Sequence, residues 1–129
     1  MSPARVTTDA APRPIGPYAQ AVVAGDLVFC AGQVGLDPDS GRLVPGGIAA
    51  ETARALENIS AVLTAVGLGL DAIVKTTVYV VDLADVATVN EIYGRYLRAP
   101  YPARATVQVA GLPAGARIEI EAVAARAGR

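Results

Sequence analysis

An arginine and two glutamates are the residues most able to do chemistry, because they recur at strand-like spacing within residues 104–124. Arg104, Glu119 and Glu121 alternate with valines and isoleucines, which predicts two strands. Gly111 and Pro113 interrupt the alternation and predict the turn between the strands. Side chains on a strand point alternately to opposite faces, so the three charged residues are expected to share one face.

The chemistry of this face depends on how the two strands pair. An antiparallel pairing about the turn places Thr106 opposite Glu119 and Arg104 opposite Glu121. One interpretation is a cross-strand ion pair, which contributes about 0.2–1 kcal/mol to stability. The other is a site in which Arg104 binds a carboxylate through two hydrogen bonds while a glutamate handles a proton or a water molecule. Periodicity alone does not choose between these interpretations, nor between Glu119 and Glu121.

Composition limits the classes of protein to which the chain can belong. Its 129 residues suffice for one domain with a buried core. Hydrophobic residues make up 53% of it and the mean hydropathy is +0.41, yet no apolar run approaches the roughly 20 residues that cross a bilayer. The apolar surplus therefore predicts self-association. A net charge of −1, with both signs scattered along the chain, argues against a nucleic-acid-binding surface.

The chain has no histidine and a single cysteine, Cys30. Zinc sites of the usual His/Cys kind and nucleophile arrangements that need histidine are therefore excluded, and we expect no metal. One cysteine cannot form a disulfide within the chain, and residues 1–11 lack the apolar segment of a secretory signal. These features predict a cytoplasmic protein in which Cys30 is a small buried apolar residue.

Periodicity along the chain predicts an α+β domain. Residues 1–14, with three prolines, are expected to form an irregular arm, and residues 15–129 a single domain. The expected strands are 18–24, 27–31, a short one near 42–44, 72–81, 104–109 and 118–124, and the expected helices are 48–66 and 82–97. The order β-β-β-α-β-α-β-β gives a mixed sheet whose two helices cover one face. The other face needs a partner, so we expect an obligate homo-oligomer with a site at a subunit boundary.

Asn90 interrupts the apolar stripe of the second predicted helix, between Val86 and Tyr93. A buried amide without a hydrogen-bond partner costs about 1–3 kcal/mol. Asn90 is therefore expected either to bond a nearby loop backbone or to face a ligand or a neighbouring subunit, and its spacing leaves both open.

Several short motifs, in order along the chain, resemble those of one family. They are Ile15-Gly-Pro-Tyr-Ala-Gln-Ala, Ala31-Gly-Gln-Val, Val74-Lys-Thr-Thr-Val-Tyr, Val89-Asn-Glu-Ile-Tyr, Pro102-Ala-Arg-Ala-Thr-Val and Ile118-Glu-Ile-Glu-Ala. A single motif such as Gly-Pro-Tyr is weak, whereas the ordered set, which runs from about residue 12 to residue 125, is specific. The chain resembles the RidA/YjgF family, also described as endoribonuclease L-PSP proteins.

This resemblance implies a chorismate-mutase-like fold assembled as a homotrimer, with clefts between the subunits. It also implies a 2-iminobutanoate/2-iminopropanoate deaminase. Such a hydrolase converts reactive enamines and imines, of which 2-aminoacrylate and 2-iminopropionate are the type, to 2-oxo acids and ammonia. The resemblance implies no cofactor and no metal. The implied partners are further copies of the chain and small imino or 2-oxo acids.

Carried over to matching positions, the resemblance implies that Arg104 binds the substrate carboxylate. Glu119 would position or activate the hydrolytic water, which leaves Glu121 as a surface or interface ion-pair partner. Tyr18 and Asn90 match residues of the substrate pocket.

Three further positions are expected to line the pocket. Gly32 lies where the family's chain approaches the ligand closely, which a residue without Cβ permits. Ala31 stands where members often have serine, and Thr106 where some have cysteine. These two departures bear on substrate preference and rate rather than on the class of reaction.

Two other functions stay open at this point. One is an endoribonuclease acting on single-stranded RNA, against which the net charge and the lack of a basic, aromatic stripe argue. The other is non-enzymatic, a trimer that binds 2-oxo acids or acts as a holdase.

Overall fold

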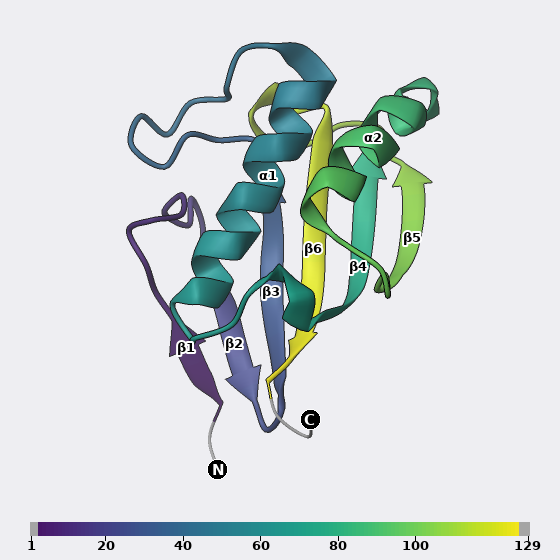
Figure 1. The fold of residues 1–129 in the computed structure, drawn as a ribbon. Coiled ribbons are helices and arrows are strands. Elements are labelled where there is room, and N and C mark those ends of the chain that lie inside the picture. The colour runs from purple at the N-terminus through teal and green to yellow at the C-terminus, as the bar shows by residue number, and fades with distance from the viewer. Residues whose placement is uncertain (1–2, 127–129) are drawn as a thin grey trace.

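The computed structural model of the chain describes residues 3–126 and consists of one mixed β-sheet and two main helices (Figure 1). The strands are β1 (Ala4–Val6), β2 (Ala21–Ala24), β3 (Leu27–Val34), β4 (Ile73–Val80), β5 (Ala103–Gln108) and β6 (Ile118–Ala125). The α-helices are α1 (Gly47–Thr64) and α2 (Val86–Tyr96), and the single 3₁₀ turns are η1 (Leu70–Ala72), η2 (Leu83–Asp85) and η3 (Pro113–Gly115). The strand order is β1-β2-β3-β6-β4-β5, and only β4 and β5 are parallel.

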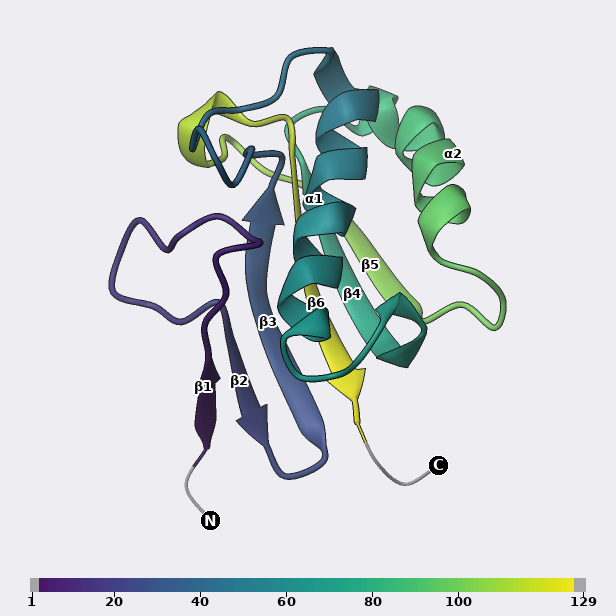
Figure 2. The ribbon, with the colours of Figure 1, turned by 60° about the vertical axis from the view of Figure 1, so that its left-hand side comes forward.

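Both helices cover the same face of the sheet (Figures 1 and 2), as the sequence predicts. Leu56, Ile59 and Leu63 recur at helical spacing along α1 and are completely buried against strand residues such as Val78 and Ile120. These contacts form the main core. In the part of the chain that the structure describes, no helix is long and apolar enough to span a membrane.

The opposite side of the sheet, called the open face here, is covered by neither α1 nor α2 (Figure 2). Leu27, Phe29 and Val107 alternate with residues that face the helices and are 38%, 46% and 41% exposed. Large apolar side chains at these exposures are available for contact with another surface.

The predicted hairpin between residues 104–109 and 118–124 is wrong. Strand β4 lies between β5 and β6 and pairs with both. The reason is the crossover through α2, which returns the chain parallel to β4 at the edge of the sheet. The connection from β5 to β6 then passes over the end of β4, where Val109 N–H donates to the Val80 carbonyl at 2.8 Å.

Three local expectations also need correction. The irregular arm predicted over residues 1–14 contains β1, which pairs with β2. The short strand predicted near residues 42–44 is only a single bridge between Leu36 and Leu43. The helix predicted from Asp82 begins as the 3₁₀ turn η2, capped by the Asp82 carboxylate, which accepts a hydrogen bond from Ala84 N–H.

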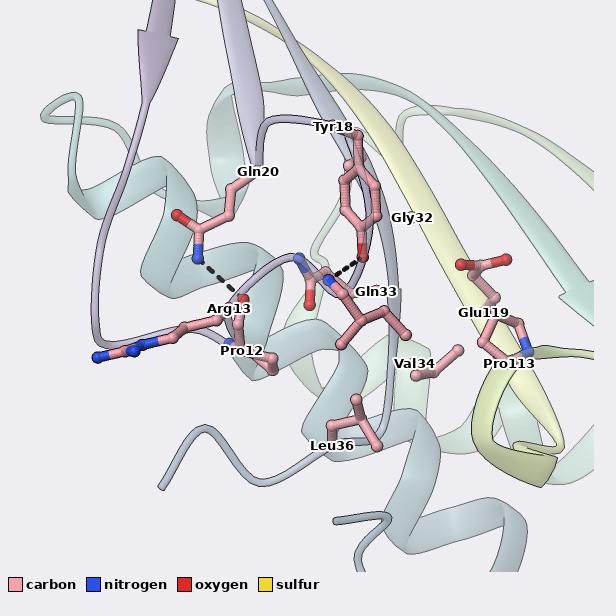
Figure 3. A pocket seen from close by; sticks show the side chains of 12 residues that line it. Pro12, Arg13, Tyr18, Gln20, Gly32, Gln33, Val34, Leu36, Pro113 and Glu119 are labelled. Atoms are coloured by element: carbon pink, nitrogen blue, oxygen red, sulfur yellow. Dashed lines mark hydrogen bonds between the residues drawn. The ribbon is translucent and has the colours of Figure 1, made fainter. Parts of the chain in front are cut away.

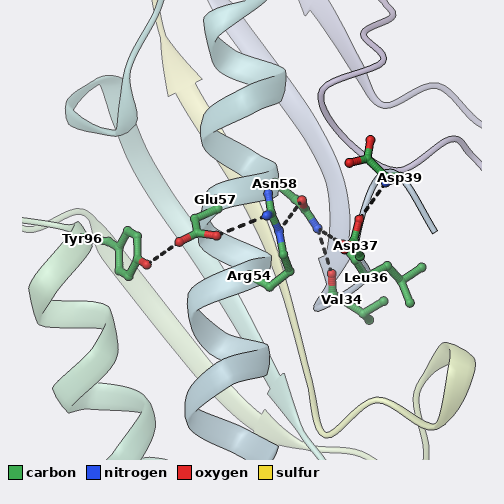
Figure 4. A network of polar contacts seen from close by, with 8 residues as sticks. All are labelled: Val34, Leu36, Asp37, Asp39, Arg54, Glu57, Asn58 and Tyr96. Atoms are coloured by element: carbon green, nitrogen blue, oxygen red, sulfur yellow. Dashed lines mark hydrogen bonds and ion pairs between the residues drawn. The ribbon is translucent and has the colours of Figure 1, made fainter. Parts of the chain in front are cut away.

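A network of polar contacts ties α1 to the end of β3 and to α2 (Figure 4). Asn58 is completely buried and donates its amide hydrogens to the carbonyls of Val34 and Leu36, at 3.2 and 2.9 Å. Arg54 donates to the Asn58 amide oxygen and pairs with Glu57, which accepts from the hydroxyl of Tyr96. The polar side chains of α1 therefore hold the segment that follows β3 in place.

A second buried contact holds the segment that precedes β6. Glu51 of α1 is completely buried, yet its carboxylate accepts from the backbone N–H of Arg117 at 2.7 Å and from the Arg117 guanidinium at 2.9 Å. Gly35 allows this approach, because a Cβ there would lie 2.8 Å from the Glu51 Cα. The contact fixes the chain two residues before Glu119.

We expect Arg117→Ala to lower the free energy of unfolding by about 2–3 kcal/mol, although half of the Arg117 side chain is exposed, because it leaves a buried carboxylate with one partner. Adding Glu51→Gln should restore part of this loss, since an amide carries no charge to bury. Urea unfolding would measure both effects. Arg95→Ala is the control, since its ion pair with Glu91 is exposed on both sides and should change stability by less than about 0.5 kcal/mol. Equal losses for the two arginines would contradict this account.

Candidate active site

Arg104 lies at the edge strand β5 and reaches toward α2, on the face of the sheet that the helices cover. Its partner in the β4–β5 register is Thr76, whose hydroxyl lies 2.7 Å from the Tyr93 hydroxyl of α2. The Arg104 guanidinium donates to the amide oxygen of Asn90 at 2.7 Å and lies 4.9 Å from the centre of the Tyr93 ring. An amide and an aromatic ring therefore orient this cation.

No carboxylate among residues 3–126 lies within ion-pairing distance of Arg104, whereas Arg54, Arg95 and Arg117 each have one. The guanidinium borders a cavity of about 260 Å³, called the arginine cavity here. Its lining residues are Asn90, Tyr93, Gly94, Tyr101, Pro102 and Arg104. An exposed, oriented guanidinium without a carboxylate partner is suited to binding an anion through two hydrogen bonds.

Glu119 lies on the open face, because its neighbours Ile118 and Ile120 are buried under the helices. It borders a second cavity of about 330 Å³, called the glutamate cavity here, together with Tyr18, Ala31 and Gly32 (Figure 3). Arg13 also borders this cavity, and its guanidinium points away from Glu119 (Figure 3). No donor in the described part of the chain hydrogen-bonds to the Glu119 carboxylate, so it is open to water or a ligand.

Gly32 brings the Glu119 carboxylate against the backbone of β3. A Cβ on Gly32 would lie 2.7 Å from Glu119 Oε2, closer than such atoms approach. The register between β3 and β6 also shifts by one residue between Cys30 and Gln33, which is the mark of a β-bulge. Gly32 was expected where the chain approaches a ligand, and in this structure the close approach is to Glu119.

Burial raises the pKa of the Glu119 carboxyl above its ordinary value, and the charge of Glu121 on the same strand raises it further. Glu121 accepts a hydrogen bond from the hydroxyl of Tyr79 at 2.7 Å. Glu121 forms no ion pair with any of the described residues, although one was expected. Its partner is the neutral hydroxyl of Tyr79. Glu119 therefore sits in an environment that favours taking up a proton.

A loop that precedes β2 forms the outer wall of the glutamate cavity. Gln20 is 3% exposed and fixes this loop by accepting from the N–H of Thr8 at 2.7 Å and donating to the carbonyls of Thr8 and Pro12, both at 3.0 Å. The Tyr18 hydroxyl accepts from the N–H of Ile15 at 3.3 Å, and its ring is half exposed (Figure 3).

The structure separates the predicted site residues into two groups. Tyr18, Ala31, Gly32 and Glu119 border the glutamate cavity, whereas Asn90 and Arg104 border the arginine cavity. The expectation that Arg104 and Glu119 share one face is wrong, because they lie on opposite faces of the sheet.

The two remaining predictions concern residues near Arg104. Thr106 lies two residues along β5, in register with Val78, and borders neither cavity. Asn90 is exposed rather than buried, and its described partner is Arg104 rather than a loop backbone.

Sequence reasoning missed three residues that shape the site. Tyr93 was assigned to the apolar stripe of α2, although it lies beneath Arg104 at 6% exposure. Its position three residues after Asn90 was the available signal, because residues at that spacing share a helix face. Nothing in the local pattern marked Gln20 or Tyr101.

Cys30 is buried, as predicted. Burial raises the pKa of its thiol to about 11, so the group is protonated at neutral pH and unreactive as a nucleophile.

The chain is similar to proteins of one family over nearly its whole length. The family model for Endoribonuclease L-PSP matches residues 8–126, and the chain belongs to this family, the RidA/YjgF family. A mouse protein named 2-iminobutanoate/2-iminopropanoate deaminase is 51% identical over 119 residues, which cover 92% of this chain and 88% of that protein.

Solved structures agree with the fold. RidA from the Antarctic bacterium Psychrobacter sp. PAMC 21119 superposes with a TM-score of 0.92 at 43% identity, covering 95% of this chain and 98% of that chain. TdcF from E. coli, solved with bound serine, gives a TM-score of 0.92 at 41% identity, covering 96% and 99%. The six-stranded α+β architecture is therefore that of the family.

We expect Glu119→Gln to raise the melting temperature at pH 7. A pKa that is higher in the folded protein means that ionised Glu119 opposes folding, and this cost grows as the pH rises from the unfolded pKa of about 4.3 through the folded value. The gain should therefore vanish below about pH 4, where both states are protonated. Thermal unfolding across this pH range would measure it, with the exposed Glu91→Gln as control. A lower melting temperature for Glu119→Gln at pH 7 would show that the carboxylate stabilises the fold.

Proposed function

We propose that this protein hydrolyses reactive 2-imino acids and their enamine tautomers, of the 2-iminopropionate and 2-iminobutanoate type, to 2-oxo acids and ammonia. The observation that carries the proposal is the exposed Arg104 guanidinium, oriented by Asn90 and Tyr93 and without a carboxylate partner in the described chain. The deaminase names of relatives about half identical to this chain support the same reaction. We further propose that it acts in the cytoplasm without a cofactor.

In this proposal Arg104 binds the substrate carboxylate. Two parallel hydrogen bonds from the guanidinium fix the plane of the acid and thereby the position of the adjacent C=N carbon. Asn90 contributes indirectly, because its amide oxygen uses one guanidinium donor and sets the direction of the others. Tyr18, Ala31 and Gly32 enclose the reacting end of the substrate beside Glu119, whereas Thr106 borders neither cavity and is given no role.

Glu119 acts on water. The substrate is the imine protonated at nitrogen, and the Glu119 carboxylate removes a proton from water as the oxygen attacks its carbon, which gives a neutral carbinolamine. Glu119 then returns that proton to the amino nitrogen and the C–N bond breaks. The carbinolamine hydroxyl loses its proton to the departing ammonia, which leaves the 2-oxo acid and ammonium. A carboxyl whose pKa is raised by burial is a better base than an ordinary glutamate, and it holds the proton long enough to return it.

A single chain cannot bring these two groups to one substrate, because the sheet separates them. A second copy that packs its arginine cavity against the glutamate cavity of the first would complete a site between subunits. The exposed apolar residues of the open face, Leu27, Phe29 and Val107, offer surface for such packing. We therefore propose a homotrimer of the chorismate-mutase-like kind, in which every subunit contributes one half to each of two sites.

RNA cleavage is a second candidate, favoured only by the family's description as endoribonuclease L-PSP. This function requires that the protein cleave single-stranded RNA, that the rate of cleavage decrease steeply as the salt concentration rises, and that the Arg104→Ala variant still cleave RNA. Equilibrium binding of a 2-oxo acid without any imine hydrolysis would instead favour a binding protein.

An assay of imine survival tests the proposed reaction. A pyridoxal-phosphate dehydratase generates 2-aminoacrylate, and semicarbazide traps the imine that remains. We expect the wild type to suppress the trapped product, Arg104→Ala to lower kcat/KM by about 100-fold or more, and Glu119→Gln to lower kcat by about 10²–10⁴-fold. Arg104→Lys keeps the charge but not the paired hydrogen bonds, so its kcat/KM should lie between the values of the wild type and of Arg104→Ala. Arg95→Ala is the control for loss of a surface arginine, and an inactive wild type would refute the proposal.

Mixed oligomers test whether two chains share one site. Arg104→Ala and Glu119→Gln subunits, each inactive alone, are unfolded together and refolded at equal amounts. If every site takes Arg104 from one chain and Glu119 from another, about one quarter of the sites regain both residues and activity returns to about that fraction. No recovery, in a preparation whose mass shows oligomers of the expected size, would place both residues of a site in one chain.

A further inference from the structure

Gly94, inside α2, has no explanation within the chain itself. Its φ is not in the left-handed region, and an added Cβ would meet no atom within 4 Å. A glycine within a helix is less favourable than alanine because it loses more backbone freedom on folding. Neither the backbone conformation nor the packing of the described chain therefore accounts for glycine at this position.

The empty space at Gly94 belongs to the arginine cavity. Gly94 lies four residues after Asn90, so both face the same side of α2, next to the guanidinium that Asn90 orients. Pro102 and Tyr101, which is 62% exposed, also line the cavity. The cavity thus has a cationic part at Arg104 and an apolar part at Gly94, Pro102 and the Tyr101 ring.

This division matches the two ends of an amino-acid-derived ligand. With the carboxylate on Arg104, the ligand's side chain extends along the helix surface over Gly94 and against the tyrosine ring. A methyl or ethyl group would leave much of that space to water, whereas a phenyl or isobutyl group would fill it and contact the ring. No lining side chain other than Arg104 carries a charge, so a charged side chain would find no partner there.

We propose that Gly94 and Tyr101 determine specificity by admitting 2-imino acids with bulky apolar side chains, aromatic or branched, to the arginine cavity. This inference rests on the proposed imine hydrolysis for its substrate, but the shape of the cavity predicts binding of the corresponding 2-oxo acids as well. An experiment can therefore refute the proposed imine hydrolysis without refuting the selection of bulky ligands, and the reverse.

Substitutions that fill the cavity give the first test. A flavin-dependent amino-acid oxidase generates imines from phenylalanine, leucine and 2-aminobutyrate, and semicarbazide traps the imine that survives. We expect the wild type to hydrolyse all three, and Gly94→Leu to lower kcat/KM for the phenylalanine and leucine imines at least about 10-fold while changing that for the small imine less than about threefold. Tyr101→Ala should raise KM for the phenylalanine imine in particular. Ala87→Leu places the same side chain at an exposed position of α2 outside the cavity and should change none of these values.

Equilibrium binding gives a second test that needs no catalysis. Calorimetric titration of the oligomer with phenylpyruvate and with 2-oxobutyrate should show that Gly94→Leu weakens phenylpyruvate binding at least about 10-fold and 2-oxobutyrate binding less than about threefold. The proposal is overturned if the wild type binds or hydrolyses only the small compounds, if Gly94→Leu affects both sizes equally, or if it changes the mass of the oligomer, because Gly94 would then serve a contact between copies. A wild type that binds phenylpyruvate but hydrolyses no imine would refute the proposed reaction and leave the size selection standing.

Discussion

The position of β4 between β5 and β6 is the constraint on which the site depends. Strand β4 pairs in register with both β5 and β6. The residue of β4 that lies opposite a residue of β5 or β6 therefore shows which face of the sheet that residue occupies. Arg104 aligns with Thr76 and faces α2, whereas Glu119 aligns with Tyr79 and faces the open side. No side-chain rearrangement can bring the cation and the carboxylate together within one chain. The proposed reaction therefore requires that two chains associate.

Buried polar groups on α1 support the surroundings of Glu119 from beneath. Glu51 holds the segment that leads into β6, and Asn58 holds the end of β3, where Val34 lies opposite Glu119. Each is completely buried and each satisfies backbone groups that secondary structure leaves unpaired. One helix thus fixes both strands that border the glutamate cavity, which explains why a polar pattern persists on its buried side. Precise placement of a carboxylate requires such support, since loop ends otherwise move freely.

The sequence was sufficient for both main helices, for strands β2 to β6 and for the layer arrangement, because helical and strand periodicities are local properties. It missed β1, which lies in the predicted irregular arm. It failed for the pairing of β5 with β6, because alternation says which residues share a face of one strand but not which strand lies next to it. The same limit hid the separation of Arg104 from Glu119. Tyr93 was missed for a different reason: its ring is both part of the core and a platform for a cation, and a pattern of apolar residues records only the first role. The resemblance identified Glu119 over Glu121, and burial beside Gly32 supplies the physical distinction between them.

The two cavities also differ in how they create reactivity. In the arginine cavity a permanent charge is oriented by neutral groups, so its attraction for an anion remains uncompensated. In the glutamate cavity the strand backbone at Gly32 and the charge of Glu121 make the ionised form of Glu119 costly. The proposed substrate brings a carboxylate to Arg104 and a protonatable nitrogen near Glu119, so the proposal assigns substrate binding to one cavity and proton transfer to the other.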